Sequence, residues 1–142
     1  ADLDAPMGLD WREVSLDVWL AAFRQLHEVP FVHYPVMREI LSRIPGEQFF
    51  ATLWDEEQLV CCGRGVLEDE YAGLFNVVTA SRFRNRGYGT VFVLGLLDRA
   101  SDRGARWAYL QVMENNDPAR HVYEKVGFSK VYDYWYRCCD TV

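Results

Sequence analysis

One segment near the middle of the chain, residues 82–89, concentrates positive charge and glycine in a protein of 142 residues with a net charge of −6. A strand-like run precedes the segment and a helical run follows it, so the first amides of that helix would attract an anion. Glycines let the backbone approach an anion closely, and clustered arginines favour a diphosphate over a neutral ligand. The residues concerned are Arg82, Arg84, Arg86, Gly87 and Gly89.

Two well-known phosphate-binding loops do not fit this segment. A dinucleotide-binding loop of the Rossmann type would need a third glycine at position 92, which is occupied by Phe92. A Walker A loop would end in Gly-Lys-Ser/Thr, whereas here Gly89 directly precedes Thr90. The Gly-x-Gly pattern alone also occurs in ordinary strand-to-helix turns, so a second motif is needed before a ligand can be inferred.

A second motif follows about 30 residues later, where Asn116-Asp117-Pro118-Ala119 precedes Tyr123 and Gly127-Phe128. Together with Arg-x-x-Gly-x-Gly at residues 84–89, it resembles the GNAT (GCN5-related N-acetyltransferase) family. The resemblance covers nearly the whole chain from about residue 9. It implies a mixed α/β (α+β) fold with a central sheet of about six to seven strands flanked by about four helices. It also implies an acetyl-CoA-dependent N-acetyltransferase.

The resemblance carries the cofactor-binding roles to particular positions. The strand ending at Thr79 would bind the pantetheine arm through its main chain, at a bulge that separates two strands and frees backbone groups for the cofactor. The loop would wrap the pyrophosphate, and residues of the second motif would flank the cofactor near its sulfur. These positions are Val77, Val78, Thr79, Arg84, Asn85, Arg86, Gly87, Tyr88, Gly89, Thr90, Asn116, Ala119 and Tyr123.

Acetyl transfer to an amine by direct attack needs a base for the amine, a donor for the oxyanion and a proton for the departing thiolate. Tyr123 is the candidate general acid, although its spacing with Ala119 and Val126 also permits a structural role. A backbone N–H near Val78 is the candidate oxyanion donor. Glu68 is the candidate base, with Glu70 as its alternative, although the position of each in a turn favours a solvated carboxylate.

The sequence does not decide whether the acetyl acceptor is a small-molecule amine or a protein amine. His33 and Tyr34, between the first two expected helices, are candidates for lining its pocket. His121 is expected to point away from the apolar face of its helix and receives no role. The aromatic residues of the first two helices and of the last strands indicate either a partly apolar acceptor or a homodimer contact. The alternative function is an acyl-CoA-binding sensor without turnover, within a longer polypeptide.

The composition of the chain argues against two classes of partner, nucleic acid and membrane. A pI near 5.0 argues against nucleic acid, and no apolar run approaches the roughly 20 residues that a membrane helix requires. The start of the chain lacks the features of a signal peptide. The adjacent pairs Cys61-Cys62 and Cys138-Cys139 do not form a metal motif, and they indicate reduced strand cysteines, half of them buried, in a cytoplasmic protein. We expect no metal.

The expected elements form one domain over residues 9–142, after a tail at 1–8, and the domain is either the whole protein or the C-terminal part of a longer one. Hydrophobic periodicity predicts strands and helices in the order β-α-α-β-β-β-α-β-α-β. Ser15 is the expected cap of the first helix. The strands are expected at 11–14, 49–54, 59–66, 71–79, 107–112 and 131–138, and the helices after Ser15, from Pro35, at 88–101 and at 117–126.

Overall fold

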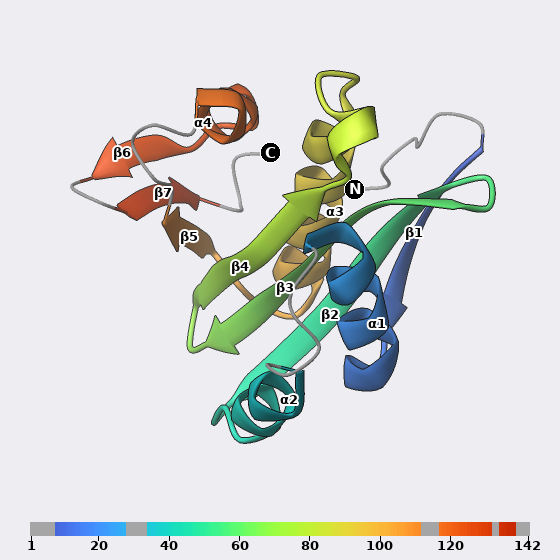
Figure 1. Ribbon diagram of the computed structural model, residues 1–142. Coiled ribbons are helices and arrows are strands. Elements are labelled where there is room, and N and C mark those ends of the chain that lie inside the picture. The colour runs from blue at the N-terminus through green and yellow to red at the C-terminus, as the bar shows by residue number, and fades with distance from the viewer. Residues whose placement is uncertain (1–7, 28–33, 112–116, 132–133, 139–142) are drawn as a thin grey trace.

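The computed structural model describes residues 8–27, 34–111, 117–131 and 134–138, which form one mixed sheet of seven strands with four α-helices and one short 3-10 helix (Figure 1). The elements are β1 (Leu9–Val14), α1 (Leu16–His27), α2 (Tyr34–Ser42), β2 (Glu47–Asp55), β3 (Gln58–Glu68), β4 (Tyr71–Thr79), the 3-10 helix (Ser81–Phe83), α3 (Tyr88–Asp102), β5 (Trp107–Gln111), α4 (Asp117–Lys125), β6 (Ser129–Val131) and β7 (Tyr134–Cys138).

The sheet has the strand order β1-β2-β3-β4-β5-β7-β6. Every neighbouring pair is antiparallel except β4 and β5, which run parallel. A parallel pair needs a long crossover, and α3 supplies it. Tight turns at Glu56 and Asp69, both at positive φ, connect the antiparallel strands β2, β3 and β4. The predicted mixed α/β fold is therefore confirmed.

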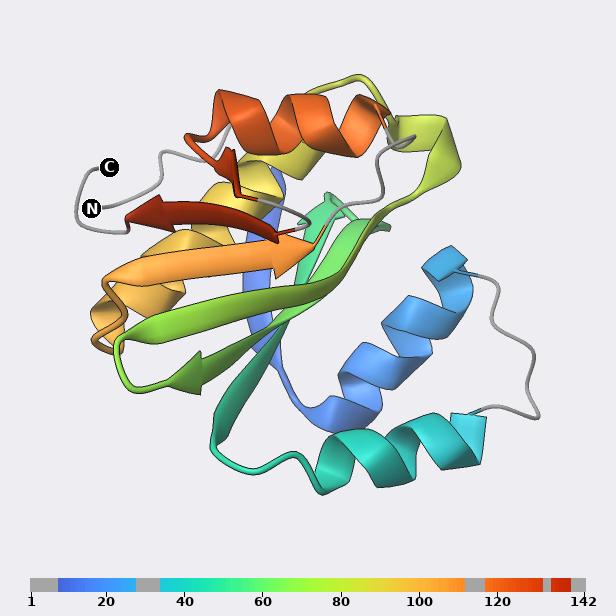
Figure 2. The same ribbon diagram turned by 90° about the vertical axis from the view of Figure 1, so that its left-hand side faces the viewer.

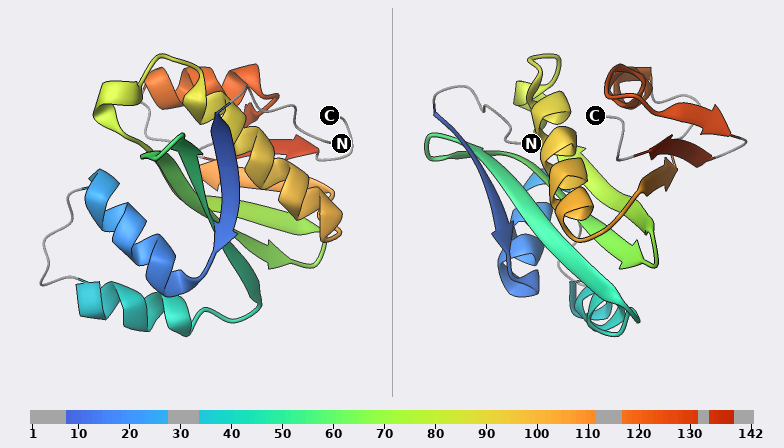
Figure 3. Two further views of the ribbon diagram at one scale, coloured as in Figure 1. Left: turned by 90° about the vertical axis from the view of Figure 1, so that its right-hand side faces the viewer. Right: turned by 180° about the vertical axis from the view of Figure 1, so that it is seen from behind.

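Helices cover both faces of the central strands and create two apolar cores. α1 and α2 lie on one face of β2–β4, and α3 lies on the other (Figures 2 and 3). Cys61 and Cys62 show this division, because Cys61 belongs to the core under α3 and Cys62 to the core under α1. Both thiols are free and fully buried, as expected for neighbours on a strand covered on both sides.

The first helix begins as predicted, since the hydroxyl of Ser15 accepts a hydrogen bond from the Val18 amide at 3.2 Å. The last predicted strand, 131–138, was wrong as a single element. Val131 ends β6 and Tyr134 begins β7; these two strands pair antiparallel with each other, and β7 in turn pairs with β5. No glycine or proline lies between the two strands, so the sequence did not mark them as separate elements.

No helix among the described residues is long and apolar enough to cross a membrane.

The edge strand β1 is fastened to α3 through Trp11. The indole N–H donates to the carbonyl of Phe92 at 3.3 Å, and the guanidinium of Arg99 lies over the indole ring at 5.2 Å. Gly95 makes this contact possible, because a Cβ at that position would collide with the indole ring of Trp11. A glycine inside a helix is normally unfavourable, so its presence here reflects close packing.

We expect Gly95→Ala to lower the free energy of unfolding by about 1–3 kcal/mol, because overpacking against Trp11 outweighs the helix propensity of alanine. Urea unfolding would measure the change. Ser101→Ala, later in the same helix, serves as the control and should change stability by less than about 0.5 kcal/mol. A gain of about 1 kcal/mol for Gly95→Ala, the amount that propensity alone predicts, would contradict this packing.

Candidate active site

The site begins at a β-bulge in β4. Cys62 pairs with Val78 and Arg64 pairs with Phe75, so two residues of β4, Asn76 and Val77, oppose one residue of β3. Asn76 adopts a φ of 54°, a conformation that asparagine tolerates better than most residues. The extra residue bends the strand and leaves part of the hydrogen-bonding ladder unpaired.

Beyond the bulge, β4 and β5 separate. Within the described residues, Tyr71–Gly73 pair with Trp107–Tyr109, while β4 continues to Thr79 (Figure 1). Gly63 allows α3 to pack closely against the bulge, because a Cβ on Gly63 would approach Phe92 Cε2 to 2.8 Å. The last residues of β4 therefore present backbone groups that are not paired with β5.

The separated strand leads directly into an anion-binding geometry at the start of α3. Asn85 and Gly87 both have positive φ, 64° and 86°, and Gly87 is the N-cap of α3 without any side-chain cap. The first amides of the helix are thus left for a ligand. A Cβ on Gly87 would meet nothing within 4 Å, so its backbone conformation, not lack of space, requires glycine.

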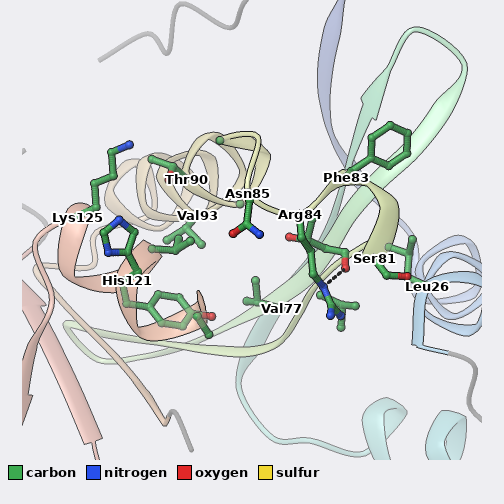
Figure 4. Close-up of a pocket in the computed structure, with 17 residues that line it drawn as sticks. Leu26, Val77, Ser81, Phe83, Arg84, Asn85, Thr90, Val93, His121 and Lys125 are labelled. Atoms are coloured by element: carbon green, nitrogen blue, oxygen red, sulfur yellow. Dashed lines mark hydrogen bonds between the residues drawn. The ribbon is translucent and has the colours of Figure 1, made fainter. Parts of the chain in front are cut away.

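These two features open onto one pocket of about 1070 Å³ (Figure 4). Residues from β4, the loop, α3, α4 and the end of α1 surround it. Figure 4 shows Leu26 of α1 on the opposite side from His121 and Lys125 of α4. The lining residues are Leu26, Val77, Val78, Thr79, Ser81, Phe83, Arg84, Asn85, Gly87, Gly89, Thr90, Val93, Ala119, His121, Val122, Tyr123 and Lys125.

Most of the residues assigned from the sequence to the cofactor lie together in this pocket. They come from the end of β4, from the loop and start of α3 that follow it directly, and from α4, which begins only at Asp117. The lining members of that set are Val77, Val78, Thr79, Arg84, Asn85, Gly87, Gly89, Thr90, Ala119 and Tyr123. Asn116 and His33 lie outside the described residues, and Tyr34 begins α2.

Arg86 and Tyr88 are not among the pocket-lining residues. The Tyr88 hydroxyl donates to the carboxylate of Asp55 on β2, and its ring meets that of Phe83 edge-on. The hydrogen bond to Asp55 is the main reason why the pKa of Tyr88 is raised. Arg86 lies over the Phe83 ring at 5.8 Å. These side chains therefore fix the loop, and only their backbone amides stay near the helix start.

Arg84 connects the loop to the end of β4. Its Nε donates to the Thr79 carbonyl at 3.4 Å, and its side chain lines the pocket. The hydroxyl of Thr79 lies 3.4 Å from the Cys61 sulfur on β3. Burial is the main reason why the pKa of Cys61 is raised, to about 12, so this thiol stays protonated and acts as a packing group.

Tyr123 lies on the buried face of α4 and lines the pocket. Its ring meets that of Phe128 edge-on at 5.8 Å. Burial, and to a smaller extent the Cys61 thiol, raises the pKa of Tyr123 to about 12. The phenol is therefore protonated at any physiological pH and is available as a hydrogen-bond donor.

Glu68, the predicted base, is exposed at the end of β3 and pairs with Tyr71. Tyr71 and Val78 lie seven residues apart along β4, a span of roughly 20 Å. Glu70 follows in the same turn, and neither carboxylate is among the pocket-lining residues. The structure thus does not bring this carboxylate together with Tyr123.

The sequence analysis missed the basic side of the pocket. His121 points away from the apolar face of α4, as expected, but that exposed side faces the pocket. Lys125 follows four residues later on the same side of the helix and lines the pocket too. This i, i+4 spacing of basic residues beside the second motif was the available signal.

No group of three or more His, Cys, Asp or Glu side chains that could hold a metal ion occurs within the part of the chain that the structure describes.

Comparison with known proteins agrees with this geometry. Residues 11–128 match the model of the Acetyltransferase (GNAT) family. The chain is 33% identical to the uncharacterized N-acetyltransferase YobR of Bacillus subtilis over 127 residues, which is 89% of this chain and 51% of that protein. It is 33% identical over 60 residues to the [ribosomal protein bS18]-alanine N-acetyltransferase of Haemophilus influenzae, covering 42% of this chain and 40% of that protein. The chain thus spans about half the length of the curated relatives that it matches.

Solved structures show the same fold at low sequence identity. A spermidine N-acetyltransferase mutant from Vibrio cholerae superposes with a TM-score of 0.76 at 16% identity, covering 95% of this chain and 96% of that chain. The ribosomal-protein-S18-alanine N-acetyltransferase from Escherichia coli gives 0.72 at 18% identity, with 90% of both chains covered. With the family model matching most of the sequence, the chain belongs to the GNAT family of acetyltransferases.

Proposed function

We propose that the protein is an N-acetyltransferase that moves an acetyl group from acetyl-CoA to a primary amine by direct attack. The observation that carries the proposal is the single pocket in which the separated end of β4, the start of α3 and Tyr123 meet. An elongated thioester substrate with a diphosphate at one end requires this combination of extended backbone, anion site and proton donor.

The residues present fit acetyl-CoA. The free amides at the start of α3, with Arg84 beside them, suit the pyrophosphate. The backbone of Val77–Thr79, which is not paired with β5, suits the amides of the pantetheine arm. An amide near Val78 is the proposed oxyanion donor. On the other side of the pocket, Lys125 adds positive charge toward an anionic substrate, and the His121 imidazole lies beside it.

Tyr123 is the proposed general acid. Its raised pKa of about 12 keeps the proton on the phenol, so the group can donate a hydrogen bond to sulfur as negative charge develops there. A tyrosine with the ordinary pKa of about 10 would lose this proton in mildly alkaline solution. Burial therefore extends the range of pH over which the donor is present.

The acceptor is proposed to be a small-molecule or protein amine. Structures with the same fold include a spermidine N-acetyltransferase, a ribosomal-protein-S18-alanine N-acetyltransferase, and AAC(6')-Iy in complex with a bisubstrate analog, CoA-S-monomethyl-acetylneamine. All of these acceptors are amines, and they differ greatly in size and charge. The class of the reaction is thus common to the neighbours, and the acceptor has to be inferred from this chain's own residues.

We expect Gly89→Ala to weaken acetyl-CoA binding at least about tenfold, or 1.4 kcal/mol, without unfolding the protein. The added Cβ would meet Thr79 Oγ1 at 3.5 Å and Val122 Cγ2 at 3.6 Å, which are ordinary contacts, so the fold tolerates the methyl group. The methyl would nevertheless project into the pocket at the start of α3. Calorimetric titration with acetyl-CoA would measure the loss.

The melting temperature of Gly89→Ala provides the control, and it should equal or exceed that of the wild type because alanine favours the helix. Unchanged acetyl-CoA affinity in a folded Gly89→Ala protein would show that the ligand does not approach the helix start closely.

We expect Tyr123→Phe to lower kcat about 100-fold, as for loss of a general acid, while acetyl-CoA binding stays unchanged. The measurement is thiol release from acetyl-CoA with a panel of primary amines. In the wild type, Tyr123 should cause no loss of rate below about pH 11, because its raised pKa keeps the proton in place and is exceeded only near pH 12. An alkaline fall centred near pH 10 that disappears in Tyr123→Phe would contradict the assigned environment.

If acetyl-CoA binds and no amine in the panel is acetylated, the enzyme proposal is wrong, and the acyl-CoA sensor becomes the better explanation.

A further inference from the structure

Arg64 is a buried cation next to the bulge, on the face of the sheet that carries α1 and α2. It lies two residues after Cys62 on β3, and Cys62 pairs with the pocket residue Val78. Cys62 and Val78 both belong to the core under α1, so Arg64 shares their face by strand alternation. Two residues along a strand correspond to roughly 6–7 Å. Arg64 is therefore a near neighbour of the proposed reaction centre, on the side opposite α3.

The charge of Arg64 has no counter-ion within the described part of the chain. The residue is only 9% exposed, and no carboxylate there forms an ion pair with it. Burial alone accounts for the lowered pKa of the guanidinium, without any offset from an acidic neighbour. A buried charge without a partner is destabilising, so the described residues alone do not explain an arginine here on structural grounds.

The guanidinium is nevertheless held firmly at one edge. Its Nε donates to Oδ1 of Asn76 at 2.8 Å, and its carbon lies 4.8 Å above the ring centre of Phe75. Asn76 is the residue of the bulge with positive φ, so the same distortion that separates β4 from β5 orients the arginine. In contrast, Nη1 is buried and has no hydrogen-bond partner among the described residues. One donor is fixed and another is left unsatisfied, which is the arrangement expected of a binding group.

Two half-buried aromatic rings lie beside Arg64. The ring of Phe75 meets that of Tyr109 edge-on at 6.2 Å, and both cover Gly73, where a Cβ would approach the Tyr109 hydroxyl to 2.8 Å. Phe75 and Tyr109 are half-buried and Asn76 is exposed, so a ligand can reach this part of the face. Because Gly73 has no side chain, the rings of Phe75 and Tyr109 can pack over it, next to the guanidinium.

We infer that Arg64 binds the carboxylate of the acetyl acceptor, and hence that the acceptor is an amino-acid-like amine in which amine and carboxylate lie a few bonds apart. This inference rests on the proposed acetyltransferase function. A carboxylate matches the planar guanidinium and supplies the missing charge. The separation between Arg64 and Val78, which corresponds to two residues along the strand, fits a short amino acid. A polyamine or an aminoglycoside, both cationic, would instead be repelled by Arg64.

The test compares matched acceptors in wild type and in Arg64→Met. Free amino acids, their α-carboxamides and spermidine are assayed by thiol release from acetyl-CoA. The wild type should acetylate at least one amino acid with a kcat/KM at least tenfold above that of its carboxamide. In Arg64→Met this ratio should fall to about one through a rise in the KM of the amino acid, while the KM of acetyl-CoA is unchanged. Methionine removes the buried charge and keeps an apolar side chain, so the variant should fold.

Two further variants separate binding from packing. Asn76→Gly keeps the positive φ and removes the amide that holds Nε, so it should lower the same ratio several-fold. Arg12→Met is the matched control, because Arg12 also lies over an aromatic ring, that of Trp54 at 5.2 Å, yet is exposed on β1. It should leave the ratio unchanged.

Preference of the wild type for carboxamides or spermidine would overturn the inference, and so would a ratio that survives in Arg64→Met. Failure of the proposed function gives a different result, in which no amine is acetylated at all. In that case calorimetry of the same amino acids against the protein saturated with coenzyme A decides the inference. Binding that Arg64→Met abolishes supports it, and no binding, or equal binding by both proteins, overturns it.

Discussion

The bulge in β4 is the constraint on which the rest of the structure depends. By placing Asn76 and Val77 opposite the single residue Gly63, it turns the end of β4 away from β5. A regular ladder would have paired those backbone groups with β5 and left none for a ligand. Asparagine lowers the cost of the left-handed conformation, and Gly63 leaves the room that Phe92 and Val77 occupy. A local distortion of one strand thus produces a binding surface.

The position of the anion site follows from the same distortion. The strand ends at Thr79, where Arg84 contacts the Thr79 carbonyl and the Cys61 thiol contacts its hydroxyl. On the other side of the loop, the Tyr88 hydroxyl bonds to Asp55 on β2. The helix start is therefore fixed from two directions relative to the bulge. This rigidity matters because an elongated substrate must fit its diphosphate and its thioester at once.

Local signals in the sequence were sufficient for the loop and for most elements. Gly87 and the arginines beside it mark the helix start because the conformation of a turn depends on adjacent residues. Features that depend on register could not be predicted in this way. Arg64 reads as an ordinary strand residue, and only the pairing across the bulge brings it to Asn76. Similarly, the position of Glu68 relative to the pocket depends on which end of β4 carries the bulge.

The charges around the pocket bear on how the acceptor would lose its proton. Among the described residues that line the pocket there is no aspartate or glutamate, whereas Arg84 and Lys125 are cations. Arg64 adds a buried cation beside the bulge, and the high pKa of Tyr123 keeps that phenol neutral. Nearby positive charge disfavours an ammonium ion and lowers its pKa. Under the proposed mechanism, such surroundings favour the free amine before attack, with its proton leaving to water. A carboxylate base within the pocket is then not required, and the same cations stabilise the negative charge that develops on the thioester.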